Sequence, residues 1–390
     1  MGRVDARNDD FDVESLLAEA SAATGLSDFG DSDFREPLGV LCQTYQRNAY
    51  DERGRKRNRR RVLQLLTSRL RVEDALRRHP EIRQREIRSP MVLTGLPRSG
   101  TSALFSLLAA DPVARPLLLW ETQFPDPAVG LAPGAPDPRY QAVKAYYEQS
   151  HQKNPEFTKI HYASADTPEE CVLLHALSLN GVHYGVEVML EPYASWYRKQ
   201  DLLPMYRYYR ALLQMLDWQR PGERWLLKAP AHMWAIDALI ETFPDVGIVW
   251  SHRDPLLCIA SVCSMTYAIT NGSLQMSKRE LGPRVFDFYA TSLERGLAVR
   301  ERSDSARYVD VTHDDFVDDA LGVARRIYAH FGLSLSRAAE AALRAHIVEN
   351  PKGKRGRHAY ALEEWGLSAD AVRERFAPYI ERFGLGGDGE

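Results

Sequence analysis

The chain has 390 residues and a formal net charge of −3, with 44% hydrophobic and 26% charged residues. This composition is typical of a soluble globular protein, and so small a net charge argues against binding to nucleic acid or to an anionic membrane. The four cysteines form no CxxC pair and no metal-spaced cluster, and no apolar run reaches membrane-spanning length. We therefore expect a cytoplasmic protein without a metal or a disulfide framework.

The N-terminal part of the chain is expected to be helical. Apolar positions recur at helical spacing in Val13–Ala23, and a second helical segment is expected at Pro37–Tyr50. The most basic run, Arg53 to Arg61, has two readings: a nucleic-acid or localisation signal, or the solvated face of a helix that continues to Leu70. We favour the helix face, because the rest of the chain is not basic and carries no interleaved aromatic platform.

The stretch from Ser89 to Asp111 reads S-P-M-V-L-T-G-L-P-R-S-G-T-S-A-L-F-S-L-L-A-A-D. Met91–Leu96 is an apolar run typical of a strand buried on both faces, and Ala103–Ala110 is rich in the helix formers Ala and Leu. A short loop of small residues between a strand and a helix points backbone N–H groups at an anion, which the helix dipole also favours. We therefore predict a phosphate-binding loop, whose candidate ligands are Arg98, Ser99, Gly100, Thr101 and Ser102.

This loop departs from the Walker A motif G-x-x-x-x-G-K-[ST] of ATP- and GTP-binding proteins. Gly95 stands five residues before Gly100, but Thr101 occupies the position of the lysine that reaches the β- and γ-phosphates. Ordinary ATP or GTP chemistry is therefore disfavoured. The alternative is a turn whose hydroxyls only cap the helix, and the segments downstream weigh against it.

After this loop the chain alternates between apolar runs and helical patterns. A strand is expected at Ala114–Trp120, ending at Glu121. The residues T-P-E-E carry the signals of a helix start, with Thr167 as N-cap and Glu170 three residues on, so a helix is expected to continue through Asn180. Further helices are expected at Tyr140–Gln152 and Pro204–Trp218.

Three more strands are expected at Arg224–Lys228, Val246–Ser251 and Arg307–Val311, each followed by a helix, and a last helix at Ala369–Phe383. Strands that alternate with helices predict an α/β domain with a mostly parallel sheet, which binds ligands at the carboxyl ends of its strands. We expect residues 89–390 to form this domain and residues 1–88 to form a helical extension packed on it. Polar side chains expected at this edge of the sheet are Glu121, Lys228, Arg253 and Ser261, the serine about two helical turns inside a helix.

The segments from about Pro90 to Gly366 resemble the sulfotransferases that use 3′-phosphoadenosine 5′-phosphosulfate (PAPS). The resemblance is greatest to the broad bacterial family that also resembles tyrosylprotein sulfotransferases, and it implies a P-loop NTPase-like, three-layer α/β/α sandwich. In that family the P-R-S-G-T-[ST] loop, here Arg98 to Ser102, binds the 5′-phosphosulfate end of the nucleotide. An arginine and a serine eight residues further on bind the 3′-phosphate, and a K-G-x-x-G loop closes over the nucleotide. The matching residues here are Arg253, Ser261, Lys352, Gly353 and Gly356.

The chemistry of sulfuryl transfer assigns roles to the charged candidates. Lys228 is a point charge suited to the bridging oxygen that leaves, and Arg98 is suited to the non-bridging oxygens. The general base has two candidates. Cytosolic members of the family place a catalytic histidine two residues after the lysine, where this chain has Pro230 and where His232 is the nearest histidine. The tyrosylprotein type uses a glutamate followed by threonine about twenty residues beyond the loop, which matches Glu121.

We expect Glu121 to be the base and His232 to contribute less. The structural alternative for Glu121 is an ion pair with an arginine under the sheet, and His232 has a helix-orienting role as its alternative. Two alternatives stay open for His161, Tyr162, His183 and Tyr184: they line an acceptor pocket, or they simply pack in the core.

The sequence thus predicts a PAPS-dependent sulfotransferase that acts on a hydroxyl of a small, partly apolar acceptor. Its second product is adenosine 3′,5′-bisphosphate (PAP), and it needs no metal, nucleic acid or membrane span; the sequence leaves a homodimer open. One rival is a P-loop nucleotide or small-molecule kinase, against which the missing loop lysine and the lack of an evident magnesium-binding aspartate argue. Another is a nucleotide-binding protein without catalysis, against which intact Lys228 and Glu121 argue.

Overall fold

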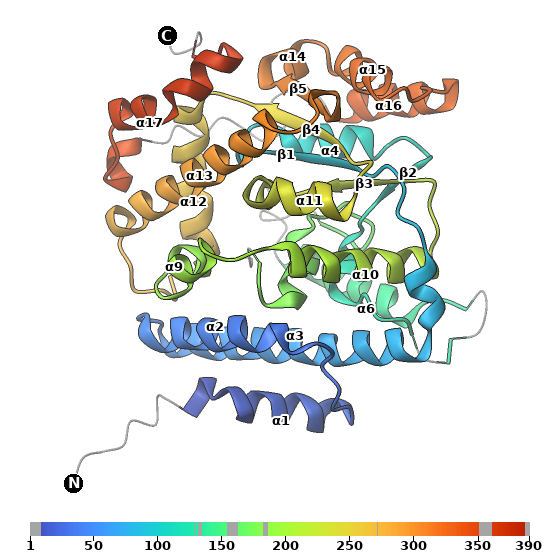
Figure 1. Cartoon of the computed structure of the whole chain (residues 1–390), viewed down its shortest axis with the longest axis vertical. Helices are drawn as coiled ribbons and strands as arrows, with labels where there is room; N and C mark the ends of the chain where they lie inside the picture. The colour runs from blue at the N-terminus through green and yellow to red at the C-terminus, as the bar shows by residue number, and fades with distance from the viewer. Residues whose placement is uncertain are drawn as a thin grey trace.

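The computed structural model describes residues 9–128, 130–131, 135–153, 163–181, 186–270, 272–350 and 361–386. A parallel sheet of five strands in the order β2-β3-β1-β4-β5 crosses the upper half of the molecule in Figure 1. Each neighbouring pair is parallel, so all the strands end at one edge of the sheet. The strands are β1 Met91–Gly95, β2 Ala114–Pro116, β3 Arg224–Lys228, β4 Gly247–His252 and β5 Tyr308–Thr312.

Alternating side chains of the strands enter two separate apolar cores, one on each face of the sheet. Leu93 and Val249 belong to one core, whereas Val92, Ile248 and Trp250 belong to the other. This period of two is the geometry of a strand buried on both faces. Helices of the first core are α4 Thr101–Leu108, α15 Ala320–His330 and α16 Arg337–Glu349, and those of the second include α11 Ile236–Thr242, α12 Pro255–Thr270, α13 Lys278–Glu301 and α17 Ala369–Phe383. The result is the three-layer α/β/α arrangement expected from the sequence.

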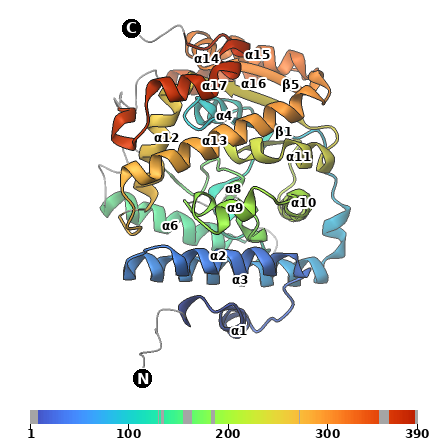
Figure 2. The same ribbon diagram turned by 60° about the vertical axis from the view of Figure 1, so that its left-hand side comes forward.

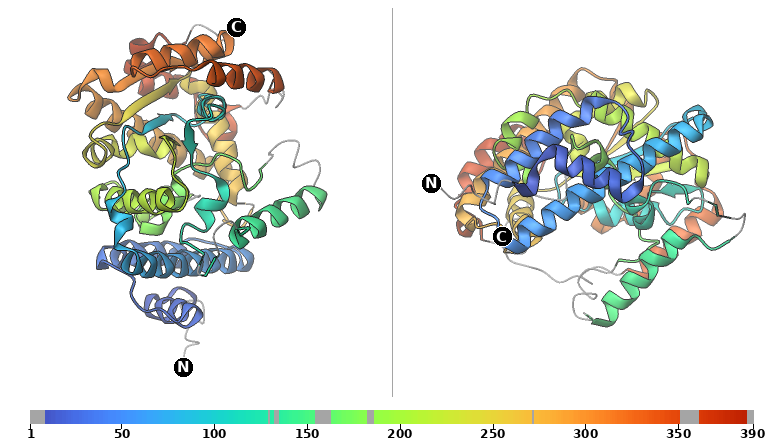
Figure 3. Two further views of the ribbon diagram at one scale, coloured as in Figure 1. Left: turned by 90° about the vertical axis from the view of Figure 1, so that its right-hand side faces the viewer. Right: turned by 90° about the horizontal axis from the view of Figure 1, so that it is seen from below.

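The N-terminal helices lie below the sheet, on the side of the second core (Figures 1 and 2). They are α1 Val13–Thr24, α2 Arg35–Arg47 and α3 Glu52–Arg78, and their buried faces contribute to the same core as α10 Leu203–Gln219. Seen from below, α1 and α3 cross the base of the molecule, whereas α6 Pro138–Lys153 extends outward (Figure 3).

The basic run lies on helix α3, as the helix-face reading predicted. Arg59 pairs with Glu19 of α1, with Nη2 and Oε2 2.5 Å apart, and Lys56 pairs with Glu52 one turn away. One of these pairs lies along the surface of α3, and the other ties α3 to α1.

The second strand is shorter than the apolar pattern predicts. It ends at Pro116, and a short helix, α5 Leu119–Gln123, follows at once. The carboxylate of Glu121 accepts a hydrogen bond of 3.0 Å from the backbone N–H of Leu118, which satisfies a donor at the start of this helix. The expected strand Ala114–Trp120 was therefore wrong in its second half.

The T-P-E-E segment is extended, so the helix start predicted there was wrong. Leu119 donates its N–H to the Thr167 carbonyl at 2.9 Å, and Glu169 donates its own N–H to the Leu117 carbonyl at 2.8 Å. Tertiary backbone pairing thus takes up the groups that a helical first turn would have used. A helix begins only at α8 Val172–His175.

Among the helices of the described ranges, none combines the length and the apolar character that crossing a membrane would need.

Candidate active site

The loop between β1 and α4 is held in a conformation that brings backbone close to backbone. Gly95 has φ 142°, and a Cβ atom there would lie 2.3 Å from the Ser251 carbonyl oxygen. Gly100 (φ 93°) begins α4, and Arg98 adopts a positive φ of 73°. Since a side chain at Gly95 would collide with β4, only glycine allows this approach. A positive φ is uncommon for a residue other than glycine, and such strained backbone clusters at ligand-binding and active sites.

This loop has the donors that a phosphate or sulfate group requires. The N-terminus of α4 presents N–H groups that have no acceptor within the helix, and its dipole favours a negative charge. Ser99 and Ser251 are buried, and the hydroxyl oxygen of each lacks a hydrogen-bond partner among the described residues. Buried polar atoms without partners call for a ligand or water. The loop therefore fits an anionic group.

The residues expected to bind the 5′ and 3′ ends of the nucleotide are in direct contact. Arg98 donates from Nε to the Ser261 hydroxyl at 3.0 Å, and Arg253 donates from Nη1 to the Arg98 carbonyl oxygen at 3.0 Å. Arg253 follows β4, and Ser261 lies two turns inside α12, as the spacing predicted. Three residues distant in sequence thus form one cationic corner above the ends of β1 and β4.

A residue that the sequence did not single out borders this corner. His313 follows β5, and its ring atom Cδ2 would lie 3.3 Å from a Cβ added to Gly100. Its pKa is lowered by burial and then by the positive charge of Arg253. The neighbouring charge that lowers this pKa is the same one that would attract an anion to the loop.

Lys228 stands at the end of β3, beside the phosphate-binding loop. Its side chain is almost fully buried, and its ammonium group donates to the Ser102 hydroxyl at 3.2 Å and forms an ion pair with Glu170. Glu170 retains 29% side-chain exposure. A buried ammonium needs a partner, and in this structure a carboxylate open to solvent supplies it.

Backbone pairing brings Glu170 to this position. Cys171 donates its N–H to the Lys228 carbonyl at 3.0 Å, which fixes the extended segment against the end of β3. Burial raises the pKa of Glu169, the residue that precedes Glu170. Sequence reasoning treated Glu170 as a capping residue and so missed its place in the site. The two consecutive carboxylates directly before an apolar run were the signal that was available.

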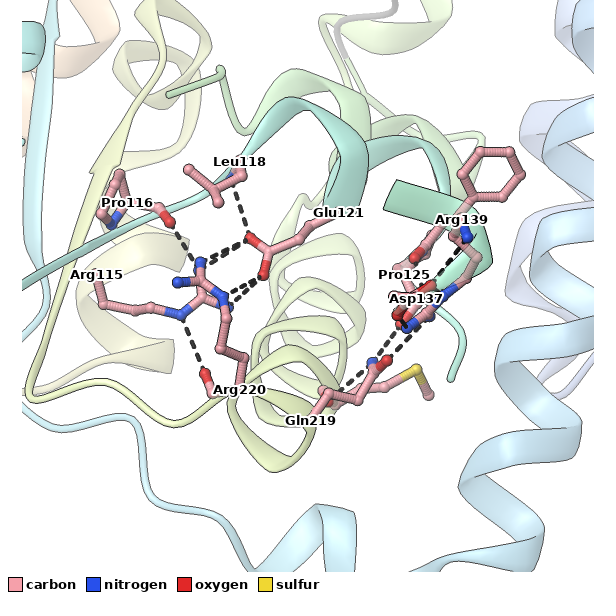
Figure 4. Close-up of polar contacts among 11 residues, drawn as sticks. Arg115, Pro116, Leu118, Glu121, Pro125, Asp137, Arg139, Gln219 and Arg220 are labelled. Atoms are coloured by element: carbon pink, nitrogen blue, oxygen red, sulfur yellow. Dashed lines mark hydrogen bonds and ion pairs between the residues drawn. The ribbon is translucent and has the colours of Figure 1, made fainter. Parts of the chain in front are cut away.

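Glu121 lies in an ion-pair cluster with Arg115 and Arg220 (Figure 4). Its carboxylate accepts hydrogen bonds from Arg115 at 2.7 and 2.9 Å, from Arg220 at 3.1 and 3.4 Å, and from the backbone of Leu118. The Glu121 side chain is 1% exposed and that of Arg115 is 2% exposed. Both oxygens are occupied, so the geometry matches the structural alternative and gives no support to Glu121 as the base.

His232 is fully buried beneath the sheet edge. Its Nδ1 lies 2.7 Å from the Tyr206 hydroxyl, and its ring packs 5.3 Å from the ring of His175. Burial lowers the pKa of His232 from 6.5 to about 3. An imidazole with so low a pKa is a weak base, and the His232 side chain has no exposed surface. It is therefore poorly suited to take a proton from an acceptor hydroxyl near neutral pH.

The remaining expected residues lie outside the described residues: Lys352, Gly353 and Gly356 of the K-G-x-x-G match, and the acceptor candidates His161, Tyr162, His183 and Tyr184. Within the part of the chain that the structure describes, no group of three His, Cys, Asp or Glu side chains is arranged to hold a metal ion.

A family model described as "Sulfotransferase family" matches residues 90–337. This range includes the phosphate-binding loop, Lys228, Arg253 and Ser261. It covers more than half of the chain, and the chain therefore belongs to the sulfotransferase family.

Two solved structures from mycobacteria share the fold over nearly the whole chain. Sulfotransferase STF1 from Mycobacterium tuberculosis is 36% identical, with a TM-score of 0.82 over 94% of this chain and 98% of its own. Sulfotransferase STF9 from Mycobacterium avium is 27% identical, with a TM-score of 0.88 over 97% of this chain and 98% of its own. The likeness includes the N-terminal helices, since the coverage exceeds the range of the family model.

A curated relative matches over a shorter stretch. The omega-hydroxy-beta-dihydromenaquinone-9 sulfotransferase Stf3 of Mycobacterium bovis is 26% identical over 161 residues, which is 41% of this chain and 40% of that protein. The match thus spans less than half the length of either protein.

Proposed function

We propose that the chain transfers a sulfuryl group from PAPS to a hydroxyl of a small acceptor. The observation that carries this proposal is the contact between the anion-binding loop and the Arg253–Ser261 pair, because Arg98 contacts both partners. A nucleotide with phosphates at both its 5′ and 3′ positions has charges that match the two halves of this corner. The family and the sulfotransferase named among its relatives support the same reaction.

In this reaction the bond between the acceptor oxygen and sulfur forms while the bond from sulfur to the bridging phosphate oxygen breaks. The leaving oxygen develops negative charge, and the acceptor hydroxyl loses its proton. Lys228 would stabilise the leaving oxygen, and Arg98 would stabilise the non-bridging sulfate oxygens. The proton would pass to a carboxylate, so the products are a sulfate ester and PAP.

We propose Glu170 as that carboxylate, in place of Glu121. Glu170 is partly exposed and is paired with Lys228, the residue assigned to the leaving oxygen. Bound donor would compete with Glu170 for the ammonium group, and a carboxylate released from its ion pair is a stronger base. The two residues would therefore act together at the reacting sulfur.

Calorimetric titration of the full chain with PAP, adenosine 5′-phosphate (AMP) and ATP tests the donor assignment. We expect PAP to bind more tightly than AMP, because only PAP carries the 3′-phosphate, and more tightly than ATP. Tighter binding of ATP would instead support a kinase. Transfer of radiolabelled sulfate from PAPS across a panel of alcohols and phenols then distinguishes an enzyme from a binding protein.

A further inference from the structure

A cavity of about 250 Å³ lies away from the phosphate-binding loop, between helix α3, the turn Glu187–Met189 and the end of α12. Its lining includes Asn58, Glu187 and Ile269, and Tyr50 at the start of the α3 segment. The cavity thus joins the N-terminal helices to the α/β core. None of these residues belongs to the site described above.

Three side chains that line this cavity have a buried atom without a hydrogen-bond partner among the described residues: Tyr50, through its hydroxyl, and the two almost fully buried groups Glu187 and Asn58. Glu187 is 4% exposed, and its Oε1 accepts a hydrogen bond of 2.9 Å from the Tyr45 hydroxyl, whereas its Oε2 has no hydrogen-bond partner among the described residues. Asn58 is 3% exposed, and within the same ranges its Nδ2 also lacks a partner of good geometry. Such atoms cost free energy unless a ligand or water satisfies them. The Glu187 atom is an acceptor and the Asn58 atom is a donor, so they complement a group that both donates and accepts.

The charges around the cavity favour a neutral ligand group. Arg57 lines the cavity, but it donates to the Thr270 carbonyl at 3.3 Å and to the Ser273 hydroxyl at 2.9 Å at the end of α12. Arg61 adds a second positive charge to the lining. The buried oxygen of Glu187 would repel an anion brought into the cavity, whereas a hydroxyl or an amide can donate to it.

One face of α12 connects this cavity to the phosphate-binding loop. Ser261, Met265 and Ile269 follow one another at intervals of four residues and so lie along one side of the helix. Ser261 contacts Arg98, Met265 is 39% exposed, and Ile269 is 43% exposed and lines the cavity. Eight residues of helix span about 12 Å. Two exposed apolar side chains, Met265 and Ile269, therefore lie on this face between the loop and the cavity.

We propose that the cavity is a second subsite for the acceptor, which binds a hydroxyl or amide at the far end of an elongated alcohol. The proposal rests on the proposed function for the site at the other end of α12. The reacting hydroxyl would lie at Lys228, the apolar middle along Met265, and the distant polar group against Glu187 and Asn58. An extended chain rises about 1.2 Å per bond, so about ten bonds cover the roughly 12 Å of α12 between Ser261 and Ile269.

Calorimetry on the full chain, with and without PAP, tests this subsite directly. The probes are three linear molecules of about ten carbons: a diol with a hydroxyl at each end, the corresponding mono-alcohol, and the corresponding hydroxy acid. We expect the diol to bind about tenfold or more tightly than the mono-alcohol, because only the diol reaches the Glu187 carboxylate. Equal binding of the two alcohols, or tighter binding of the hydroxy acid, would overturn the assignment.

Two variants separate the subsite from general effects on the fold. Ile269→Trp should fill the mouth of the cavity and remove the preference for the diol, and Glu187→Gln should reduce the preference by removing the charged acceptor. Val348→Trp, at a position 79% exposed on α16, is the control and should change nothing.

PAP binding is measured on the same samples and should be unchanged in all three variants. An unchanged diol preference in Ile269→Trp would overturn the subsite. Failure of the wild-type chain to bind PAP would instead count against the proposed donor site, and the diol titration without PAP would still decide the subsite.

Discussion

Two carboxylates stand near the carboxyl ends of the neighbouring strands β2 and β3, and their surroundings differ. Glu121 is 1% exposed and receives hydrogen bonds from two arginines and a backbone N–H. Glu170 retains 29% side-chain exposure and pairs with Lys228 beside the phosphate-binding loop. A buried carboxylate whose oxygens are both paired cannot be removed without leaving a buried cation uncompensated, whereas a partly exposed carboxylate with one exchangeable partner is available for chemistry. Residue type and distance in sequence from the loop did not distinguish these two cases.

The largest effect is expected from Glu170→Gln. Loss of a positioned general base lowers kcat by about 10²- to 10⁴-fold. PAP should bind at least as tightly as it binds the wild type, because it no longer competes with a carboxylate for Lys228. The almost fully buried Lys228 loses its charged partner, so the free energy of unfolding should fall as well. The loss should be smaller than in Glu121→Gln, because Glu170 is partly exposed and water can reach the ammonium's partner position. Steady-state kinetics at saturating PAPS, with chemical denaturation of the same sample, provide both numbers. Full activity in this variant would remove Glu170 from the mechanism.

Glu121→Gln is the matched substitution, and the opposite pattern is expected. Removing this charge leaves the buried guanidinium of Arg115 without compensation, which should cost about 3–5 kcal/mol of unfolding free energy. The kcat of the protein that remains folded should stay near that of the wild type. A stable variant with a strongly reduced kcat would restore Glu121 as the base and contradict the different roles assigned to Glu121 and Glu170.

Arg253→Ala tests the proposed contact between Arg253 and the 3′-phosphate. Loss of a charge-assisted contact should weaken PAP by about 1.5–3 kcal/mol, or about 10- to 150-fold, and should leave AMP nearly unaffected. Arg207→Ala, which removes an exposed arginine of α10, serves as the control. Calorimetric titration with both nucleotides measures the two affinities. An equal loss of affinity for PAP and AMP would show that Arg253 does not bind the 3′-phosphate.

The smallest effect concerns acid stability. Burial lowers the pKa of His232 to about 3 in the folded chain, so the unfolded chain takes up a proton first as the pH falls below about 6.5. Stability is therefore lost as the pH falls through this range, by about 2 kcal/mol from His232 between pH 7 and pH 5. Denaturation curves at both pH values should show a smaller loss in His232→Phe. The same loss in both proteins would mean that His232 is not buried in its neutral form.

Most of the sheet could be predicted from the sequence. The ends of β1, β3, β4 and β5 lie within one residue of the predicted ends, because each strand is a short apolar run bounded by polar or small residues. Arg98, Arg253 and Ser261 also came together as expected, since the carboxyl ends of parallel strands share one edge.

The errors have one physical cause, which is backbone pairing between segments distant in sequence. The T-P-E-E residues carry local signals for a helix, but pairing with Leu117 and Leu119 holds them extended. That pairing places Glu170, and not Glu121, beside Lys228. The two consecutive carboxylates before an apolar run mark the segment, but the partner of a charged side chain depends on such distant contacts, so this local pattern could not show that Glu170 pairs with Lys228.

A crystal structure of the chain with PAP bound tests the central claim most directly. We predict the 5′-phosphate in the loop from Leu96 to Ser102 and the 3′-phosphate against Arg253 and Ser261, with the Lys228 ammonium moved from Glu170 towards the 5′-phosphate. A nucleotide bound elsewhere, or a Lys228–Glu170 ion pair that stays intact with no contact to the nucleotide, would contradict the proposed function.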